Sequence, residues 1–476
     1  MDLSDPLPAH RVLFAASECA PLAKTGGLGD VCAALPPALR ALGLDVRVLL
    51  PGYREVLAAA SCRLVAHIEI LRLQARLLEA RLPGEVPAVI LDCPALYDRA
   101  GGPYQDAQGR DWPDNALRFG ALAKAAALLS SARSPLQWRP DVLHCHDWQA
   151  ALAPAFLAEE RERTPSVLTI HNLAFQGNFA PEILPALGLP ASRYSIDGLE
   201  FYGKASFLKG GLLLADALTT VSPTYAAEIQ TPEFGCGLDG VLRLRSGVLS
   251  GILNGIDTTA WNPAKDRFVE KRYSARDLSS KKVNKAALQK RMGLEETEEM
   301  PLFGTVGRMT HQKGTDLILE AIDELAALGQ VALVGTGERA LEEAARAAAR
   351  RYPGRVAASI GFSEPLAHLL EAGADIFLMP SRFEPCGLNQ MYSQRYGTPP
   401  VVRATGGLAD TVEDGRTGFL FEGDLAGAAR RAAQAWRRPK AWRALQRAGM
   451  ARDFSWSAAA RRYAALYSRL AARQPA

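Results

Sequence analysis

The chain is 476 residues long, and its hydrophobic fraction of 48% and charged fraction of 22% are ordinary values for a globular protein. Its 55 basic and 51 acidic residues leave a formal charge of +4, and the basic residues are spread through both halves. This distribution argues against a nucleic-acid-binding protein, which would gather its basic residues in a dense stripe. The length predicts two domains.

At the start of the chain, the segment MDLSDPLPAHRVLFAASECAP is acidic and interrupted by proline, so we expect no signal peptide. No apolar run approaches the roughly 20 residues that span a bilayer. The seven cysteines are scattered, odd in number and never paired as Cys-x-x-Cys. This pattern argues against a disulfide framework and a zinc site, and it favours a cytoplasmic protein that contacts no membrane.

Short apolar segments alternate with longer amphipathic segments along the chain. In the first half, strands are predicted at residues 11–17, 46–51, 88–92, 141–147, 166–171 and 217–222, and helices at 31–43 and 115–132. Strands that are apolar throughout and are followed by helices are typical of parallel strands buried on both faces. The pattern restarts after Asn254, with strands predicted at 302–308, 331–335, 356–362, 376–381 and 399–405. We therefore predict two doubly wound α/β halves, which bind ligands at the carboxyl ends of their strands.

The boundary between the halves lies in residues 251–266, where Gly, Asn, Pro and charged residues replace the strand pattern. We expect domains at residues 1–253 and 254–454. The basic segment 281–291 predicts a solvated helix face in preference to a binding patch. Residues 455–476 predict a terminal amphipathic helix that can pack on either domain, and we assign it to the N-terminal domain.

Three glycine-rich segments match nucleotide-binding loops only in part. Residues 198–205 have the spacing of a P-loop, but Ala205 stands where a Ser or Thr would hold magnesium. Residues 235–240 fit a dinucleotide-binding fingerprint by letter, but no strand precedes them. Residues 335–340 follow a strand and precede a helix, yet the next strand ends without the acidic residue that binds a ribose. A tight turn before a helix explains residues 335–340 about as well.

The segment KTGGLGD, residues 24–30, follows the first predicted strand and leads into a helix. Paired glycines such as Gly26 and Gly27 let a ligand approach the backbone closely, and a helix N-terminus provides free N–H groups for an anion. Lys24 adds a full positive charge at the same loop. Taken by itself, a glycine-rich turn with a solvent-exposed lysine explains this segment equally well.

Two cations, Arg308 and Lys313, lie five residues apart in GRMTHQKG, residues 307–314, at the end of another predicted strand. Arg can bind two oxygens of a phosphate while Lys acts as a point charge, so the pair suits a diphosphate. Surface arginines and lysines are common, but they seldom stand together in such a loop. We therefore favour a functional interpretation.

Two further segments in the second half carry polar groups at strand ends. Glu384 lies between prolines and glycine in PSRFEPCGL, residues 380–388. A carboxylate there suits hydrogen bonds to sugar hydroxyls, or stabilisation of positive charge on a sugar ring. The segment TGGL, residues 405–408, opens a helix and offers further N–H groups to a phosphate.

In the first half, His146 and Asp147 follow one predicted strand, and His171 with Asn172 follows the next. Strand-end histidines are often satisfied core or loop residues. Two of them in one half nevertheless favour a polar sugar pocket.

These motifs resemble those of the bacterial glycogen synthases and plant starch synthases. The matching segments run in the family's order from about residue 12 to residue 470, and they are KTGGLGD, TIHNLAFQG, FLKGGLLLADALTTVSPTYAAEI, LNGID, GRMTHQKGTDL, PSRFEPCGLNQ and TGGLADTV. The resemblance implies the GT-B fold, an α/β architecture of two Rossmann-like domains that face each other across a deep cleft. It also implies transfer of glucose with retention of configuration, without a metal or another cofactor. The chain has no Asp-x-Asp triplet, which the other large glycosyltransferase fold uses to hold manganese.

The resemblance also assigns roles to individual residues. It implies four catalytic residues, of which one contacts the transferred glucose (His171), two contact the diphosphate (Arg308 and Lys313) and one is the carboxylate at the sugar (Glu384). The substrate-binding residues that it implies are Lys24, Gly26, Gly27, Asp30, Asp147, Asn254, Cys386, Gly387, Thr405, Gly406, Gly407 and Leu408. Tyr392 departs from the wider GT-B pattern, which has a second glutamate there, but starch-type synthases share this difference.

We therefore expect the chain to move glucose from ADP-glucose to the non-reducing end of an α-1,4-glucan in glycogen biosynthesis. A retaining GT-B hexosyltransferase that uses UDP-glucose is the alternative. A nucleotide-dependent dehydrogenase would need the missing ribose-binding acid, and a glucan-binding protein without activity would not need Arg308, Lys313 and Glu384 together. Retention can arise from a Glu384 nucleophile or from attack on the leaving group's own face, and the resemblance favours the second.

Overall fold

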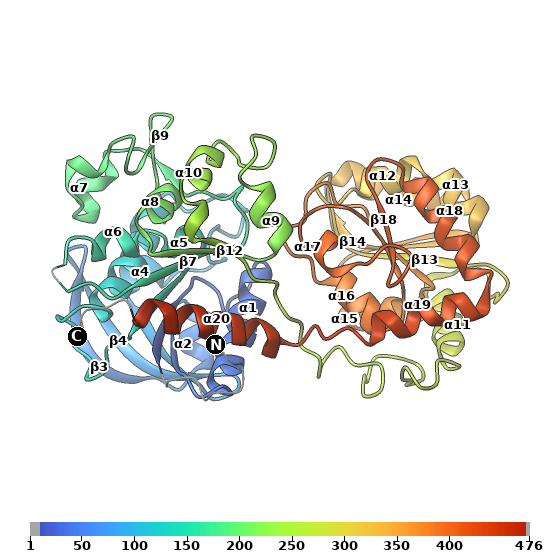
Figure 1. Cartoon of the computed structure of the whole chain (residues 1–476), viewed down its shortest axis with the longest axis horizontal. Coiled ribbons are helices and arrows are strands. Elements are labelled where there is room, and N and C mark those ends of the chain that lie inside the picture. The colour runs from blue at the N-terminus through green and yellow to red at the C-terminus, as the bar shows by residue number, and fades with distance from the viewer. Residues whose placement is uncertain (1–9, 161, 473–476) are drawn as a thin grey trace. The chain divides into compact units, whose positions relative to one another are not determined.

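The computed structural model describes residues 10–160 and 162–472, and the chain divides into two compact units (Figure 1). Unit 1 comprises Met1–Asn254 together with Trp456–Ala476, and unit 2 comprises Gly255–Ser455. The chain therefore leaves unit 1 once and returns to it with its last helix. Each unit is built on a sheet of its own, and neither main sheet includes a strand of the other unit.

Nine strands form the main sheet of unit 1, in the spatial order β12 (Leu249–Gly251), β11 (Ala217–Thr220), β7 (Ser166–Ile170), β6 (Val142–His146), β1 (Arg11–Ala15), β2 (Asp45–Pro51), β5 (Val86–Asp92), β4 (Leu73–Leu82) and β3 (Arg63–Ile70). The pairs from β12 to β5 are parallel, whereas β4 pairs antiparallel with both β5 and β3. Strands β6 and β7 are buried along their whole length, as expected of strands covered on both faces.

The helices of unit 1 follow its strands in the chain. They are α1 (Gly27–Arg40), α2 (Arg54–Ala59), α3 (Pro94–Tyr97), α4 (Asn115–Leu129), α5 (Asp147–Ala150), α6 (Ala153–Leu157), α7 (Ile183–Leu187), α8 (Phe207–Leu214), α9 (Pro223–Glu228), α10 (Asp239–Leu244) and α20 (Trp456–Ala471), with short 3-10 turns at Ala191–Arg193 and Ser246–Val248. A small antiparallel sheet of β8 (Asn178–Phe179), β10 (Lys204–Ser206) and β9 (Glu200–Phe201) completes the unit.

The last helix, α20, packs against α1 and β6 of unit 1 (Figure 1). Tyr463 and Tyr467 on its inner face are buried. The hydroxyl of Tyr467 lies 2.7 Å from Nδ1 of His144, a buried residue of β6. The apolar stripe of this helix therefore forms part of the core of unit 1.

Unit 2 is built on six parallel strands in the order β15 (Val356–Ile360), β14 (Gln330–Gly337), β13 (Leu302–Met309), β16 (Ile376–Met379), β17 (Pro400–Arg403) and β18 (Phe419–Phe421). Its helices are α11 (Lys281–Met292), α12 (Thr315–Glu320), α13 (Ile322–Leu328), α14 (Arg339–Arg351), α15 (Glu364–Gly373), α16 (Asn389–Arg395), α17 (Gly406–Thr411), α18 (Leu425–Trp436) and α19 (Pro439–Met450).

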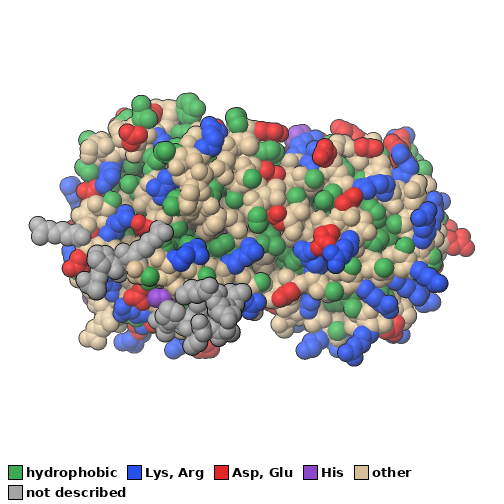
Figure 2. Space-filling view, in the orientation of Figure 1, with side chains coloured by type: hydrophobic (Ala, Val, Ile, Leu, Met, Phe, Trp, Pro, Cys, Tyr) green, Lys and Arg blue, Asp and Glu red, His purple; other side chains and the backbone are tan. Residues whose placement is uncertain are grey.

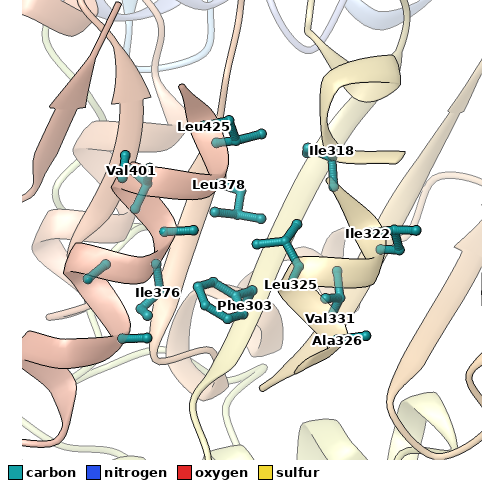
Figure 3. Packing of buried hydrophobic residues seen from close by; sticks show 14 of the residues in the cluster. Phe303, Ile318, Ile322, Leu325, Ala326, Val331, Ile376, Leu378, Val401 and Leu425 are labelled. Carbon is teal, nitrogen blue, oxygen red and sulfur yellow. The ribbon is translucent and has the colours of Figure 1, made fainter. Parts of the chain in front are cut away.

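The core of unit 2 lies on both faces of this sheet. On β16, Ile376 and Leu378 belong to one buried cluster, shown in Figure 3, and Phe377 belongs to another. Successive side chains of a strand point to opposite faces, so this division shows that both faces are covered. The continuous apolar runs of the sequence have this physical origin.

The predicted strands of both halves are present, but some elements were not predicted. Among the strands, these are the antiparallel β3 and β4, the small sheet β8-β10-β9, and the short edge strands β12 and β18. The prediction of a solvated face for residues 281–291 is wrong for two residues of α11, because Lys281 and Lys285 are buried. Their ammonium groups donate to the carbonyl oxygens of Ala372 and Met300, respectively. Among the described residues, no helix combines the length and the apolar character that crossing a bilayer requires.

Candidate active site

Each sheet has one point at which the direction of strand addition reverses. In unit 1 the chain adds β2 on one side of β1 and β6 on the other, and in unit 2 it adds β14 on one side of β13 and β16 on the other. In open α/β sheets, ligands bind outside the carboxyl ends of strands at such switch points. Predicted site segments follow the strands at these points, β1 and β6 in unit 1 and β13 and β16 in unit 2, and further ones follow β7, β12 and β17.

The Lys24 loop follows β1 and enters α1, whose N-cap is Gly26. Lys24 is exposed, and its Nζ lies 2.7 Å from Oδ1 of Asp30, so the two predicted residues form a surface ion pair. The buried carboxylate of Glu18 accepts the N–H groups of Thr25 and Gly26 at 2.6 and 3.1 Å. These two N–H groups are therefore used internally, and Lys24 is the charged group that the loop presents to solvent.

Glu18 was not among the predicted site residues. The hydroxyl of Tyr104 donates to its other oxygen, so a tyrosine far along the chain fixes the carboxylate that holds the loop. The sequence gives a weak signal for Glu18, because an acidic residue stands three positions after a strand that is buried at all but its first position. Its acceptor role depends on neighbours that only the folded chain brings together.

Asp147 and His171 follow the neighbouring strands β6 and β7, and the structure brings them into contact. Oδ1 of Asp147 accepts the backbone N–H of His171 at 2.7 Å, and Nε2 of His171 lies 2.9 Å from Nδ1 of His146. Asp147 has a φ of +52°, in the left-handed region that a non-glycine residue seldom adopts. Such backbone strain is concentrated at functional sites, so it supports a functional role for this strand end.

Burial controls the charge of this group of residues. It lowers the pKa of His171 to about 3 and lowers the pKa of His146 well below its ordinary value. Burial also raises the pKa of Asp147 to about 7, although the N–H groups of His171 and Asn172 oppose the shift. His171 is therefore a neutral imidazole at physiological pH, which allows it to lie beside a developing positive charge without repulsion.

Asn254 ends the first segment of unit 1. Its side-chain Oδ1 is buried, and no described residue donates a hydrogen bond to it. A buried acceptor without a partner is costly, so this oxygen suits a ligand's donor group.

In unit 2, the structure brings three predicted segments together at the ends of β13, β16 and β17. Gly314 adopts a φ of +70°, and a Cβ there would lie 2.2 Å from the carbonyl oxygen of Pro380. Gly406 adopts a φ of +44°, and a Cβ there would lie 2.0 Å from the carbonyl oxygen of Glu384. Only glycine permits both the positive φ and the close approach, so these two positions join the segments around Glu384.

Glu384 and Lys313 form an ion pair at the centre of this arrangement. Oε2 of Glu384 accepts from Nζ of Lys313 at 2.5 Å and from Oγ of Ser381 at 3.0 Å. The carboxylate is buried, whereas about a quarter of the Lys313 side chain is exposed (26%). No described residue donates to the second oxygen, Oε1. One oxygen of Glu384 is therefore held by the protein, and the other remains available to a ligand.

Arg308 is exposed at the end of β13, and no described residue forms a hydrogen bond or ion pair with its guanidinium. By contrast, Arg382 of the neighbouring segment pairs with Asp316 through two bonds of 2.8 and 2.6 Å. Arg308 thus offers an unpaired positive charge at the end of β13, five residues before Lys313 in the sequence. This combination suits an anionic group on a sugar.

The segment 405–408 differs from the expectation that its N–H groups are free for a phosphate. The N–H of Gly407 donates to the carbonyl of Glu384 at 3.1 Å, and that of Leu408 donates to Thr405 at 3.0 Å. The side chain of Leu408 is fully buried in the core. Cys386 is also buried, and the carbonyl oxygens of Cys386 and Gly387 accept from Gln390. In this structure the segment therefore supports the Glu384 loop.

The rejected phosphate-binding motif has a different local structure. Gly203 and Lys204 form the turn and the start of the second strand of the hairpin β9–β10, which cannot cradle a phosphate as a strand-to-helix loop does. The described residues contain no group of three or more His, Cys, Asp or Glu side chains arranged to hold a metal ion.

Comparison with known proteins agrees with this geometry. Residues 11–244 match the starch synthase catalytic domain family, and residues 288–448 match the group 1 glycosyl transferases. The chain is 54% identical over 475 residues to a glycogen synthase of Aromatoleum aromaticum, with 96% of each chain covered. It is 51% identical over 492 residues to a glycogen synthase of Nitrosomonas eutropha, which covers 99% of this chain and 98% of that one.

Comparison with solved structures also points to starch synthases. The catalytic domain of starch synthase IV from Arabidopsis thaliana, bound to ADP and acarbose, superposes with a TM-score of 0.85. The two sequences are 32% identical, and the alignment covers 98% of this chain and 100% of that one. A sucrose-phosphate synthase from Thermosynechococcus elongatus, 19% identical with a TM-score of 0.60 over 98% of this chain and 100% of that one, shares the fold. The chain therefore belongs to the glycogen and starch synthase family of glycosyltransferases, which have the GT-B fold.

Proposed function

We propose that the chain transfers glucose from ADP-glucose to the non-reducing end of an α-1,4-glucan, with retention of the anomeric configuration. The observation that carries this proposal is the Lys313–Glu384 pair at the switch point of unit 2, with the unpaired Arg308 five residues before Lys313 at the end of β13. Two cations suit the diphosphate of a nucleotide sugar, and the free Oε1 of Glu384 suits a hydroxyl of the sugar. The starch synthase that resembles this chain was solved with ADP and acarbose, which supports the choice of donor and glucan.

The reaction breaks the bond between C1 of glucose and the diphosphate oxygen. The diphosphate gains negative charge as this bond lengthens, and we assign its stabilisation to Arg308 and Lys313. The sugar becomes oxocarbenium-like, and we assign the stabilisation of its positive charge to Glu384. Preorganised charges of this kind usually supply the largest part of the rate enhancement.

Unit 1 contributes groups of a different kind. We assign donor binding to Lys24, whose ammonium is exposed, and contact with the transferred glucose to His171 and Asp147. The neutral imidazole of His171 can accept or donate a hydrogen bond to a sugar hydroxyl without adding a charge. The buried oxygen Oδ1 of Asn254 is assigned to a hydroxyl donor of the substrate.

For retention we favour attack of the acceptor hydroxyl on the face that the diphosphate leaves, with the diphosphate taking the proton. In this step the C1–O bond to the acceptor forms, the C1–O bond to the diphosphate breaks, and the acceptor proton moves to the leaving group. Glu384 is a weaker candidate for a nucleophile because its carboxylate shares its charge with Lys313 at 2.5 Å.

Steady-state rates with glycogen as acceptor test the donor. We expect kcat/KM to be larger with ADP-glucose than with UDP-glucose, and we expect ADP to be released only when an α-1,4-glucan is present. Equal or greater efficiency with UDP-glucose would favour a UDP-dependent hexosyltransferase of the same fold. We also propose that the reaction takes place in the cytoplasm, because the scattered cysteines suit a reducing compartment.

A further inference from the structure

His146 lies directly beside His171 in unit 1 and has no assigned role in glucosyl transfer. It ends β6, and His171 follows the neighbouring parallel strand β7 (Figure 1). Nδ1 of His146 lies 2.9 Å from Nε2 of His171, and the centroids of the two rings are 5.2 Å apart. The backbone N–H of His171 donates to Oδ1 of Asp147 at 2.7 Å. Asp147 therefore holds the backbone of His171, and His146 holds its ring.

The ring of His146 is itself held in place by buried neighbours. Its centroid lies 3.9 Å from that of Phe14 and 4.1 Å from that of His144. His144 is fixed at both ring nitrogens, because Nδ1 lies 2.7 Å from the hydroxyl of Tyr467 and Nε2 lies 2.6 Å from that of Thr169. His144 and His146 are fully buried, and histidine is scarcely visible on the face of the molecule shown in Figure 2. The direction of the His146 ring is therefore set by the core of unit 1.

The positions of the protons on this pair follow from the surroundings of His146. Burial keeps both imidazoles neutral, so each has one N–H and one lone pair, and one proton lies between the two facing nitrogens. If that proton belonged to His171, His146 would carry its own proton on Nε2, which is buried and has no partner among the described residues. Buried N–H groups without a partner are rarer than buried acceptors without one. Nδ1 of His146 is therefore the donor, and Nε2 of His171 is the acceptor.

This arrangement leaves the proton of His171 on Nδ1. His171 is only half-buried, and no described residue forms a hydrogen bond with its Nδ1. We propose that His146 is a positioning residue, which fixes His171 in the tautomer whose Nδ1–H donates to an oxygen of the transferred glucose. The inference rests on the proposed contact of His171 with that sugar. The hydrogen bond at one nitrogen of a histidine sets the proton on the other, so His146 controls the chemistry of a nitrogen that it does not touch.

Long-range proton–nitrogen NMR of the full chain, labelled with ¹⁵N at histidine, tests the tautomer directly. In a neutral imidazole the nitrogen that carries the proton and the one that does not have well-separated ¹⁵N shifts, and the pattern of cross-peaks tells Nδ1 from Nε2. The chain has seven histidines, so the signals of His146 and His171 can be assigned by their loss in His146→Asn and His171→Asn. We expect both residues to carry the proton on Nδ1 at pH 7. A proton on Nε2 of His171 would overturn the proposal.

Two substitutions of nearly equal shape test the effect on the reaction. Leucine and asparagine both remove the ring of His146 and its contacts with Phe14 and His144, but only the amide of asparagine can donate from the place of Nδ1. We expect His146→Leu to lower kcat by about 10- to 100-fold with KM for ADP-glucose little changed, as loss of the partners that orient metal-bound histidines does. His146→Asn should keep kcat within several-fold of that of the unmodified chain. A role in packing alone would lower kcat equally in both variants.

Tyr467→Phe is the matched control for loss of stability. It removes a buried hydroxyl that contacts His144 and not His171, so it should lower the thermal midpoint and leave kcat unchanged. Equal losses of kcat in His146→Leu and His146→Asn, or an unchanged kcat in His146→Leu, would overturn the proposal. If His146→Leu does not fold, the NMR result on the unmodified chain decides. An unmodified chain that transfers no glucose from ADP-glucose would refute the proposed function, and the tautomer of His171 would still be read from the spectrum.

Discussion

Replacement of Glu384 by glutamine distinguishes the two roles that retention allows for this residue. The Glu384→Gln side chain keeps the size of the native one, and its amide oxygen can still accept from Lys313 and Ser381, so the loop should stay in place. What is lost is the negative charge beside the reacting sugar. Because Lys313 is partly exposed, its ammonium can rehydrate, and we expect a stability loss of only about 1 kcal/mol.

The expected effect on catalysis follows from the charges. A unit charge about 4 Å from an oxocarbenium-like centre contributes roughly 4 kcal/mol at an effective dielectric constant of about 20. The neighbouring ammonium of Lys313 cancels part of this attraction, so about 4 kcal/mol is its upper limit, and loss of one preorganised electrostatic partner typically costs about 2.7–4 kcal/mol. We therefore expect Glu384→Gln to lower kcat by about 10²–10³-fold with KM little changed. The matched control is Glu422→Gln, the same change at an exposed carboxylate of unit 2, which should not alter kcat.

The assay is the steady-state release of ADP from ADP-glucose with glycogen, combined with mass spectrometry after incubation with a fluorinated donor. A nucleophilic Glu384 would form a glucosyl-enzyme intermediate, which fluorine would slow enough to detect. We expect no adduct on the peptide that contains Glu384, and an α-configured product. A glucosyl mass on that peptide, together with a far larger loss of kcat, would refute the charge-stabilising role.

Three further results are expected. Lys24→Ala should lower kcat/KM for the donor by roughly 10- to 150-fold. The thermal midpoint should stay nearly unchanged, because the exposed ion pair between Lys24 and Asp30 contributes at most about 1 kcal/mol. Lys204→Ala, at another exposed lysine of unit 1, is the control. Activity should survive treatment with EDTA, because we assign neutralisation of the diphosphate to Arg308 and Lys313; complete loss that manganese or magnesium restores would contradict this. The thermal midpoint, measured by calorimetry, should be lower at pH 5 than at pH 7. Burial lowers the pKa values of His144, His146 and His171 in the folded chain. The unfolded chain takes up protons below the ordinary pKa of histidine, and this uptake favours unfolding. Two buried carboxyls with raised pKa values, Asp147 and Glu371, oppose this trend. Only Asp147 lies in unit 1 with the three histidines, so the fall is expected for the unfolding of unit 1, and a midpoint of that unit that is constant or rises towards pH 5 would count against this assignment.

The parts of the fold that the sequence predicts are those buried on both faces. β6 and β16 are buried at every position, so their apolar runs identify them without knowledge of their neighbours. β4 has the sequence LQARLLEARL, which suits a helix by propensity, and it is a strand because β3 and β5 pair with it on either side. Pairing between distant segments overrides local preference there.

In the candidate site too, local sequence predicts individual residues but not the contacts between distant segments. Lys313 and Glu384 could be proposed from their positions at strand ends, but their ion pair joins segments 71 residues apart and is visible only in the fold. The buried lysines of α11 could not be predicted, because their acceptors, such as Thr398, lie 117 residues away from Lys281. The role of Glu18 could not be predicted for a related reason, because Tyr104, whose hydroxyl donates to its carboxylate, lies 86 residues away.

The return of α20 to unit 1 sets the order in which the protein can be completed on the ribosome. All of unit 2 is synthesised between Asn254 and Trp456, so the first segment of unit 1 must wait for it with one face of α1 and β6 uncovered. His144 lacks its Tyr467 partner for the whole of that interval. Unit 1 expressed alone therefore needs residues 456–476 fused behind Asn254, whereas unit 2, one continuous stretch of chain, can be excised without such a graft.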